Sequence, residues 1–478
     1  RGDSAIAEAT VKGRKEEVLA LVDDISIQLL IGRLRSLNNF PYDIDALDTR
    51  SYDALKTYLE GENIFRNRGG LGGAINAFQA AVDKDSTFAH AWYRLAATVW
   101  WPMHDVERAR NAIDKAIALS YDLPERERLR IEALRADLYE DAEEAEQIYR
   151  TLVSNYPEDI EAWHSLGSLL LFSASRRGLS LAGAREALER ALELDPNEWQ
   201  SLYHLAAIAA FEHKHEENRS LIARLADEDG LSLTSRSHLA FSSGDRAEQE
   251  AVMDEMREAN DHALMICVVR IVCWTDDLDR SKDAVRLISD SKRSDEMRGL
   301  GHILLAHIEA AKGRWLSAKE EFAKAKRLNP ALALEYEALI AALPFIHVPV
   351  SDLRNIESEL LEWDAESVPE SVGSMPWLTV HDELHAHLRL YLLGLINIRL
   401  GDHEGAIEYI GQLEQLDGPE RATDLSMDLV HGLRAQLNWE EGDLSGALQE
   451  FQKAKIRSPS RYRLYSQFYK QAHERFLK

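Results

Sequence analysis

The chain has 478 residues, of which 45% are hydrophobic and 29% are charged, and its formal net charge is -26. This composition can bury a continuous core, and the absence of a contiguous basic run argues against a nucleic-acid partner. The two cysteines, Cys267 and Cys273, lie on different faces of one predicted helix and cannot form a disulfide bond. No apolar run reaches the roughly 18 residues that a membrane-spanning helix needs.

Residues 1–50 differ from the rest of the chain. A polar start precedes a predicted helix at about 15–37, whose apolar residues recur along one side. A helix of this kind needs a neighbour to cover its apolar side. We therefore interpret 1–50 as the remnant of a preceding module plus a docking helix.

A spaced motif recurs in residues 51–343 and again after residue 381. It consists of a small residue, an aromatic residue or leucine four positions later, a small residue or leucine three positions after that, and then a proline. The full motif occurs at Ala145–Tyr149–Leu152–Pro157, Ala184–Leu188–Ala191–Pro196, Ala318–Phe322–Ala325–Pro330 and Ala447–Phe451–Ala454–Pro459. The spacing places three apolar residues on one face of a helix, and the proline ends that helix.

A second apolar pattern precedes this motif at a fixed distance. Ala306, Gly394 and Ala435 each lie twelve residues before the alanine that starts the next motif. Glycine stands five residues before the same alanines, at 313, 401 and 442, where a positive φ can end the first helix of a hairpin. One hairpin cannot bury its apolar face alone, so neighbours must stack. The sequence therefore predicts an all-α fold, an α-solenoid of stacked antiparallel helical hairpins.

These residues resemble the tetratricopeptide repeat, with its Trp, Leu, Gly, Ala, Phe, Ala and Pro positions. The resemblance implies a right-handed superhelix whose first helices line a concave groove. Eight side chains lie beside the core positions of these first helices and are predicted to bind a ligand in the groove: His90, Tyr93, Trp100, Trp101, His164, Tyr203, Tyr391 and Trp439. Tyr and Trp are frequent at binding hot spots. Packing within the hairpins is the alternative for each, although Trp100 and Trp101 are adjacent and cannot both point into one helical core.

Four prolines between residues 344 and 380 interrupt this pattern. They surround a predicted helix at 350–363 and an acidic, serine-rich loop, which is typical of an insertion or hinge. We expect a solenoid block at 51–343, a Pro-rich insertion or hinge at 344–380, and a second solenoid block at 381–478. The second block is predicted to end in a capping helix, Tyr462–Phe476.

Particular stretches resemble the C-terminal helical-repeat region of a group of bacterial serine/threonine protein kinases. They are Tyr52–Gly61, Asp85–Leu95, Leu123–Leu129 and Asn329–Tyr336. The resemblance implies a sensor or interaction region that a membrane span joins to a kinase domain, with the repeats outside the cytoplasm; a cytoplasmic location is the alternative. The chain lacks the kinase glycine loop, the His-Arg-Asp loop and Asp-Phe-Gly, so no kinase activity can be assigned to it.

One histidine cluster has the spacing of a metal site. His381 and His385 are four residues apart on a predicted helix, and His387 follows, a spacing that suits zinc. The glutamate of a metalloprotease helix directly follows its first histidine, but here Asp382 takes that place. The alternative is an ordinary helix start, where Asp382 and Glu383 favour the helix dipole.

No arrangement of nucleophile, base or cofactor-binding loop stands out in the sequence. We therefore predict a chain that is not an enzyme and that needs no cofactor. Its predicted function is that of a scaffold or sensor region that binds a protein or peptide, as part of a bacterial signalling protein. A structural subunit of a larger cell-surface or membrane-associated complex is the alternative.

Overall fold

The computed structural model describes most of residues 47–453. The described ranges are 9–11, 14, 21–22, 25–30, 47–66, 71–103, 106–139, 141–173, 180–225, 231–274, 278–364, 385–416 and 420–453. Within these ranges every regular element is a helix, so the predicted all-α class is confirmed. No described helix is both long and apolar enough to cross a membrane. The predicted capping helix and most of residues 1–50 lie outside the described residues.

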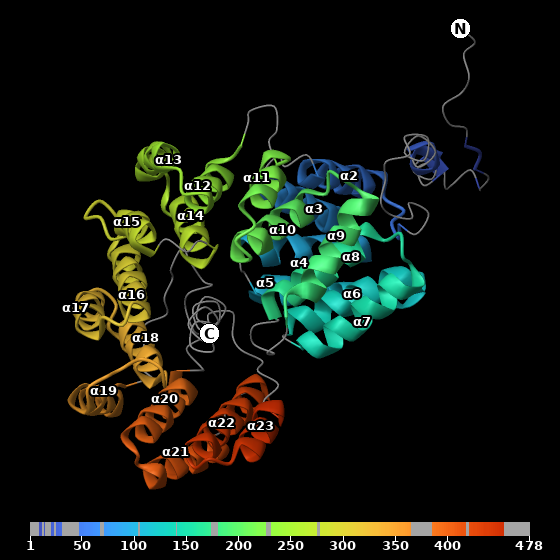
Figure 1. The fold of residues 1–478 in the computed structure, drawn as a ribbon. Helices are drawn as coiled ribbons and strands as arrows, with labels where there is room; N and C mark the ends of the chain where they lie inside the picture. The colour runs from blue at the N-terminus through green and yellow to red at the C-terminus, as the bar shows by residue number, and fades with distance from the viewer. Residues whose placement is uncertain are drawn as a thin grey trace. The chain divides into compact units, whose positions relative to one another are not determined.

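The chain forms two compact units. Unit 1 comprises the residues up to Ser173 together with Ala182–Ser201, and unit 2 comprises Ala174–Leu181 and the residues from Leu202 onward. The helices of unit 1 are α2 (Tyr52–Arg66), α3 (Leu71–Lys84), α4 (Ala89–Met103), α5 (Val106–Leu119), α6 (Glu125–Leu138), α7 (Ala142–Asn155), α8 (Ile160–Ser173) and α9 (Ala182–Leu194), as Figure 1 shows in blue to green. Each even-numbered helix and the next odd-numbered helix pack as a hairpin.

Helix α10 (Trp199–Phe211) begins at the end of unit 1 and continues into unit 2. The other helices of unit 2 are α11 (His215–Ala223), α12 (Leu233–Ser243), α13 (Arg246–Glu258), α14 (Asp261–Trp274), α15 (Leu278–Ile288), α16 (Asp295–Ala311), α17 (Trp315–Lys326), α18 (Pro330–Ala342), α19 (Val350–Glu362), α20 (His385–Leu400), α21 (His403–Gln415), α22 (Glu420–Glu440) and α23 (Leu444–Lys453). First helices also contact the first helices of neighbouring hairpins, as in α16 with α18 and α20 with α22. This stacking defines an α-solenoid.

The hairpin turns form as the sequence predicts. Gly313, Gly401 and Gly442 have φ values of 73°, 76° and 83°, in the left-handed region that glycine adopts without strain. After Gly401, the side chain of Asp402 accepts a hydrogen bond from the backbone N–H of Gly405 and caps α21. A glycine stop and an acidic cap thus reverse the chain within a few residues.

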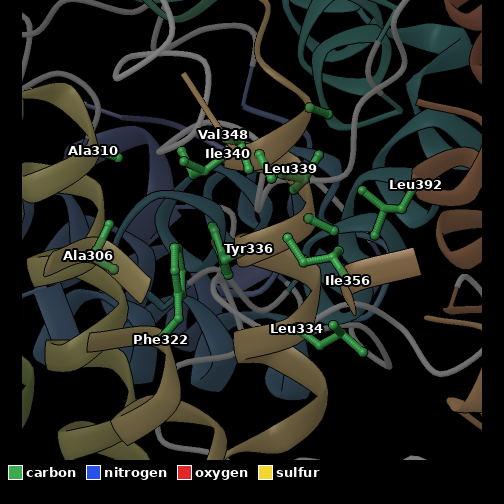
Figure 2. Close-up of a cluster of buried hydrophobic side chains, with 14 of the residues drawn as sticks. Ala306, Ala310, Phe322, Leu334, Tyr336, Leu339, Ile340, Val348, Ile356 and Leu392 are labelled. Carbon is green, nitrogen blue, oxygen red and sulfur yellow. The ribbon is translucent and has the colours of Figure 1, made fainter. Parts of the chain in front are cut away.

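Small residues bring helices close together both within a hairpin, as in α8 with α9, and between neighbouring hairpins, as in α20 with α22. A Cβ atom on Gly167 would lie 2.5 Å from Leu188 Cγ, and one on Gly394 would lie 2.7 Å from Leu433 Cδ1. Figure 2 shows the core that results in unit 2, where Ala306 of α16, Phe322 of α17 and Tyr336 of α18 are buried together. The spaced motif is therefore a packing motif, because its residues fill the space between neighbouring helices.

The core of unit 2 continues through the first part of the predicted insertion. Leu353, Ile356 and Leu360 of α19 are buried in the cluster that also holds residues of α16, α17, α18 and α20. The indole N–H of Trp315 donates to Asp352 at 2.8 Å and fixes α19 on α17. Residues 365–384 lie outside the described residues, and the division into blocks at 344–380 remains a prediction.

Candidate binding site

The predicted groove residues occupy equivalent positions on the first helices. Tyr93, His164, Tyr203 and Tyr391 each lie three residues before the small residue of their first helix, and Trp100 and Trp439 each lie four residues after it. Tyr93 and His164 are buried in unit 1, whereas Tyr203 and Tyr391 are partly exposed in unit 2. Equivalent positions therefore have different surroundings in the two units.

In unit 1 these positions belong to a buried charge network. The guanidinium of Arg94 on α4 lies 2.6 Å from Glu62 Oε1 on α2 and 2.7 Å from Glu161 Oε1 on α8. Tyr93 donates its hydroxyl hydrogen to the same Glu161 oxygen at 2.8 Å. Burial lowers the pKa of Arg94, against the opposing effect of Glu161. One arginine thus joins the first helices α2, α4 and α8.

Arg130 of α6 is the second centre of the network. Its guanidinium lies 2.9 Å from Glu127 Oε2 and 2.5 Å from Asp159 Oδ2. Asp159 also accepts a hydrogen bond from the backbone N–H of Ala162 at 3.0 Å, at the start of α8. Although burial alone would lower it, the surrounding carboxylates, led by Glu161, raise the pKa of Arg130. The carboxylates hold this guanidinium charged.

His90 closes the network at the start of α4. Its Nδ1 lies 2.6 Å from Asp48 Oδ1, and its Nε2 lies 3.5 Å from Glu127 Oε2. Burial would lower the pKa of His90, but hydrogen bonds to these two carboxylates raise it to about 9. Asp48 also accepts from the backbone N–H of Ala89 at 2.7 Å. The imidazolium therefore ties the segment before α2 to α4 and α6.

We call Asp48, Glu62, His90, Arg94, Glu127, Arg130, Asp159 and Glu161 the unit 1 charge network. Beside it, the ring of Phe65 on α2 lies 6.0 Å from that of Trp199 on α10, and His164 Nδ1 lies 3.2 Å from Ser201 Oγ. The first helix of unit 1 thus contacts the last. Side chains of the first helices of unit 1 thus contact one another, and we call the surface that these helices form the inner face of unit 1.

In unit 2, Tyr203 meets a different cation. The guanidinium carbon of Arg270 on α14 lies 3.4 Å from the centroid of the Tyr203 ring, a stacked cation–π contact. Arg270 belongs to a partly exposed stripe of α14 with Ala263 and Ile266, spaced i, i+3 and i+7. Among the described residues no carboxylate pairs with Arg270, and its burial lowers the pKa of its guanidinium. This cation contrasts with Arg94, which two carboxylates flank.

The remaining predicted groove residues lie near the end of the described solenoid. Tyr391 of α20 packs against α22, where a Cβ atom on Gly432 would lie 3.5 Å from the Tyr391 hydroxyl oxygen. Trp439 of α22 is exposed, whereas Trp100 of α4 is buried in the core of unit 1. The side chain of Trp101 lies outside the described residues, so the expected divergence of the two tryptophans remains a prediction.

The predicted metal cluster is described in part. His385 Nδ1 lies 2.7 Å from Glu335 Oε1 of α18, and His387 is buried on the same helix. His381 lies outside the described residues. Within the described ranges no group of three or more His, Cys, Asp or Glu side chains has the arrangement of a metal site. A metal at His381, His385 and His387 therefore remains a prediction without further support.

Arg94, Arg130 and Arg270 are not among the site residues predicted from the sequence. A signal was present for Arg94 and Arg270, because each stands among apolar residues of a first helix, where a charge is costly unless it is paired. Arg130 gave no such signal, because charged residues surround it in the sequence of α6. Pattern alone gives no means of telling which of these arginines have acidic neighbours, because the partners of Arg94 come from other hairpins.

The comparisons with known proteins agree with the geometry of the hairpins. The tetratricopeptide-repeat profile matches residues 389–418, which covers α20 from its second turn and all of α21. The chain is thus an all-α solenoid with a tetratricopeptide repeat in its second unit. Curated protein sequences give no match.

Solved structures with similar helices are distant from this chain. The structure described as the functional characterization of Pseudomonas aeruginosa PilF has 21% identity, covers 43% of this chain and 91% of its own, and has a TM-score of 0.28. A tetratricopeptide repeat protein from Parabacteroides merdae has 16% identity, and its match covers 60% of this chain and 98% of that protein's chain, with a TM-score of 0.30. A human IFIT1 dimer with m7Gppp-AAAA has 15% identity, and its match covers 93% of this chain and 95% of that protein's chain, with a TM-score of 0.31. No partner or activity is transferred from proteins this distant.

Proposed function

We propose that this chain is a non-catalytic scaffold that binds a protein or peptide partner on unit 2, at Arg270 and Tyr203. The observation that carries the proposal is Arg270, a partly exposed residue whose desolvated guanidinium stacks on Tyr203 and is not paired with a carboxylate among the described residues. A partly desolvated guanidinium is stabilised by an anion, and a planar carboxylate matches its geometry.

The contrast with unit 1 supports this location. The inner face of unit 1 has its own ion pairs, so a ligand that entered there would have to displace Arg94 from Glu62 and Glu161. Displacing a buried pair leaves uncompensated charges and is strongly unfavourable. Within the part of the chain that the structure describes, no carboxylate competes for Arg270, and the ring of Tyr203 offers a partner an additional apolar contact.

The chemistry of the partner follows from charge. A carboxylate would pair with Arg270, but the chain as a whole carries a net charge of -26 and repels strongly acidic molecules. The partner that fits best is therefore a neutral or basic segment with one carboxylate, such as a free C-terminus.

A peptide-binding experiment on the full chain tests this assignment. The probe is a random-sequence peptide library with free C-terminal carboxylates, compared with the same library as C-terminal amides. We expect binders only among the free carboxylates, and we expect Arg270→Gln to weaken the best binder by about tenfold or more, because charge-assisted hydrogen bonds are worth about 1.5–3 kcal/mol.

Arg236→Gln is the matched control. Arg236 of α12 already pairs with Glu255 at the surface, so its loss removes the same charge without removing the proposed anchor. Equal binding of acids and amides, or equal losses in both variants, would refute the assignment to Arg270.

At a finer level, the proposed biological setting is a bacterial signalling protein in which this chain is one module of a longer polypeptide. The support is the resemblance of Tyr52–Gly61 and three other stretches to the repeat region of bacterial serine/threonine kinases. Tethering to a membrane with the repeats extracytoplasmic belongs to the same proposal. A structural subunit of a cell-surface complex is the second candidate, and recovery of the chain from its native source in a fixed stoichiometric assembly would favour it.

A further inference from the structure

Two successive hairpins of unit 2, α10–α11 and α12–α13, carry an amide side chain in place of the alanine of the spaced motif (Figure 1). Asn218 and Gln249 lie five residues after His213 and Gly244. Both of these turn residues have a positive φ, 59° and 74°, like the turn glycines that precede the motif in other hairpins. In eight other hairpins the same position is an alanine that is 2% exposed or less: Ala74, Ala109, Ala145, Ala184, Ala284, Ala318, Ala406 and Ala447. We call α10–α11 and α12–α13 the amide hairpins.

The side chain of Asn218 links its own hairpin to the next one. Its Nδ2 donates to the carbonyl oxygen of Ala206 on α10 at 2.6 Å and lies 3.0 Å from Nε2 of His238 on α12. Its Oδ1 accepts a hydrogen bond from Ser242 Oγ at 2.9 Å. Because an amide nitrogen only donates, Nε2 of the neutral imidazole accepts and Nδ1 carries the proton, buried and without a hydrogen-bond partner among the described residues. A polar cluster thus lies where other hairpins pack an alanine.

Gln249 repeats this arrangement one hairpin later. Its Nε2 donates to the carbonyl oxygen of Ala240 on α12 at 3.3 Å, and its Oε1 accepts from Arg280 Nε on α15 at 3.2 Å. Asn218 and Gln249 are both buried, at 1% and 2% exposed. Side-chain hydrogen bonds therefore connect three successive hairpins, from α10 to α15.

Hairpins that are linked by polar groups separate more readily than hairpins that are packed by apolar groups. When they separate, water replaces the hydrogen bonds that the amides lose, so the net contribution of each bond to stability is small. Helices packed through alanine instead expose apolar surface to water, which is unfavourable. His213 adds strain to the turn of α10–α11, because a residue with a Cβ atom disfavours the positive φ that glycine adopts freely. We therefore expect local opening of unit 2 to begin at the amide hairpins.

The contact between Tyr203 and Arg270 spans the amide hairpins. Tyr203 is on α10 and Arg270 is on α14, so their stacked contact at 3.4 Å requires α10, α12 and α14 to stay together. We propose that the amide hairpins are a joint of the solenoid, whose opening separates Tyr203 from Arg270 and thereby regulates the proposed peptide site. A ligand that contacts both residues binds only the closed joint and shifts the population toward it. This regulation rests on the proposed peptide site, whereas the opening of the joint does not.

Hydrogen exchange of the full chain without a ligand, measured by mass spectrometry, tests the joint. We expect the backbone N–H groups of α11, α12 and α13 to exchange at least about tenfold faster than those of α16 and α17, after correction for intrinsic rates. Equal protection of the two regions would overturn the joint.

Two variants replace the polar links by apolar groups. Gln249→Met keeps the shape of the side chain, and Arg280 retains Asp283 as an acceptor at 3.4 Å. Asn218→Ala/His238→Leu removes both partners of a buried hydrogen bond, a change that is neutral or stabilising when the apolar groups fit. We expect each variant to slow exchange in α11, α12 and α13 by about tenfold. Faster exchange in both variants would overturn the joint, because the amides would then hold the hairpins together.

His307→Leu is the matched control. His307 is buried on α16 and lies six residues before Gly313, as His238 lies six residues before Gly244. We expect this substitution to leave exchange in α11, α12 and α13 unchanged, because it removes a buried imidazole outside the amide hairpins. Slowing by the control that equals the slowing by Asn218→Ala/His238→Leu would contradict the assignment to these hairpins.

The best binder from the free-carboxylate library tests the regulation. At about ten times its Kd, a ligand that binds only the closed joint should slow exchange in α11, α12 and α13 by about tenfold and leave α16 and α17 unchanged. Binding that Arg270→Gln weakens but that leaves exchange in α11, α12 and α13 unchanged would overturn the regulation and keep the proposed site. If no free carboxylate binds, the proposed site and its regulation both fail, and the joint is decided by the measurements without a ligand.

Discussion

The substitution Arg94→Met tests whether the unit 1 charge network holds the first helices together. Arg94 is buried between Glu62 and Glu161, so its removal takes the closest cation away from two buried carboxylates. Loss of one partner of a buried pair costs about 3–5 kcal/mol. Burial already raises the pKa of Glu62, which can take up a proton, so Glu161 remains the main uncompensated charge. We therefore expect about 3 kcal/mol, near the lower limit of that range.

Urea unfolding followed by circular dichroism measures the loss, and hydrogen exchange in α2, α4 and α8 locates it. Exchange is needed because a solenoid can unfold in parts and need not follow a two-state transition. The control is Arg434→Met, which removes a surface partner of Glu414 and should cost no more than about 1 kcal/mol. A loss for Arg94→Met within error of this control would refute the reasoning.

Two further predictions concern the packing and the pH response of unit 2. Gly394→Ala places a Cβ atom 2.7 Å from Leu433 and should destabilise the protein by about 1–3 kcal/mol in the same urea assay. Gly411→Ala is the control, because its Cβ atom meets no atom within 4 Å, and it should stabilise the protein by up to about 1 kcal/mol. Equal effects of the two substitutions would contradict a tight approach of α20 and α22. Burial lowers the pKa of His238 from the ordinary 6.5 to about 4. Between these two pH values the folded state binds fewer protons than the unfolded chain. The free energy of unfolding should therefore fall as the pH falls from about 6.5 to 4. A pKa shift of that size corresponds to about 3 kcal/mol, and His238→Leu should remove that much of the pH dependence of the free energy of unfolding. An unchanged pH dependence would contradict the burial of a neutral imidazole beside Asn218.

The hairpins could be predicted from the sequence because the signals that form them are local. The glycines at 313, 401 and 442 stand at a fixed distance from the motif, and all three take the positive φ that the turn needs. The alanine and aromatic residues of the motif are buried in the core, as at Ala318 and Phe322. Local spacing therefore suffices for the fold class.

The inner face of unit 1 could not be predicted in the same way. Tyr93 and His164 have the residue types of a binding groove, yet Tyr93 bonds to Glu161, which lies 68 residues away. Whether such a side chain lines an open groove depends on how closely the first helices approach one another. Spacing within one hairpin carries no information about that distance.

The composition of residues 344–380 did not indicate that their first part packs into the core of unit 2. The prolines indicated a break in the array, but the apolar residues Leu353, Ile356 and Leu360 repeat at helical spacing and pack into the core of unit 2. Pro349 precedes the first residue of α19, a position where proline does not disrupt a helix. Proline here marks the start of a helix within the solenoid.

The most direct test of the proposed site at Arg270 and Tyr203 is to locate where a bound peptide protects the full chain from hydrogen exchange. Hydrogen exchange should be measured with and without the best binder from the free-carboxylate library. We expect slower exchange in α10 and α14 around Tyr203 and Arg270, and loss of this effect in Arg270→Gln. Slower exchange in α4, α6 and α8 instead would contradict it, because the unit 1 charge network would then have opened to admit a ligand.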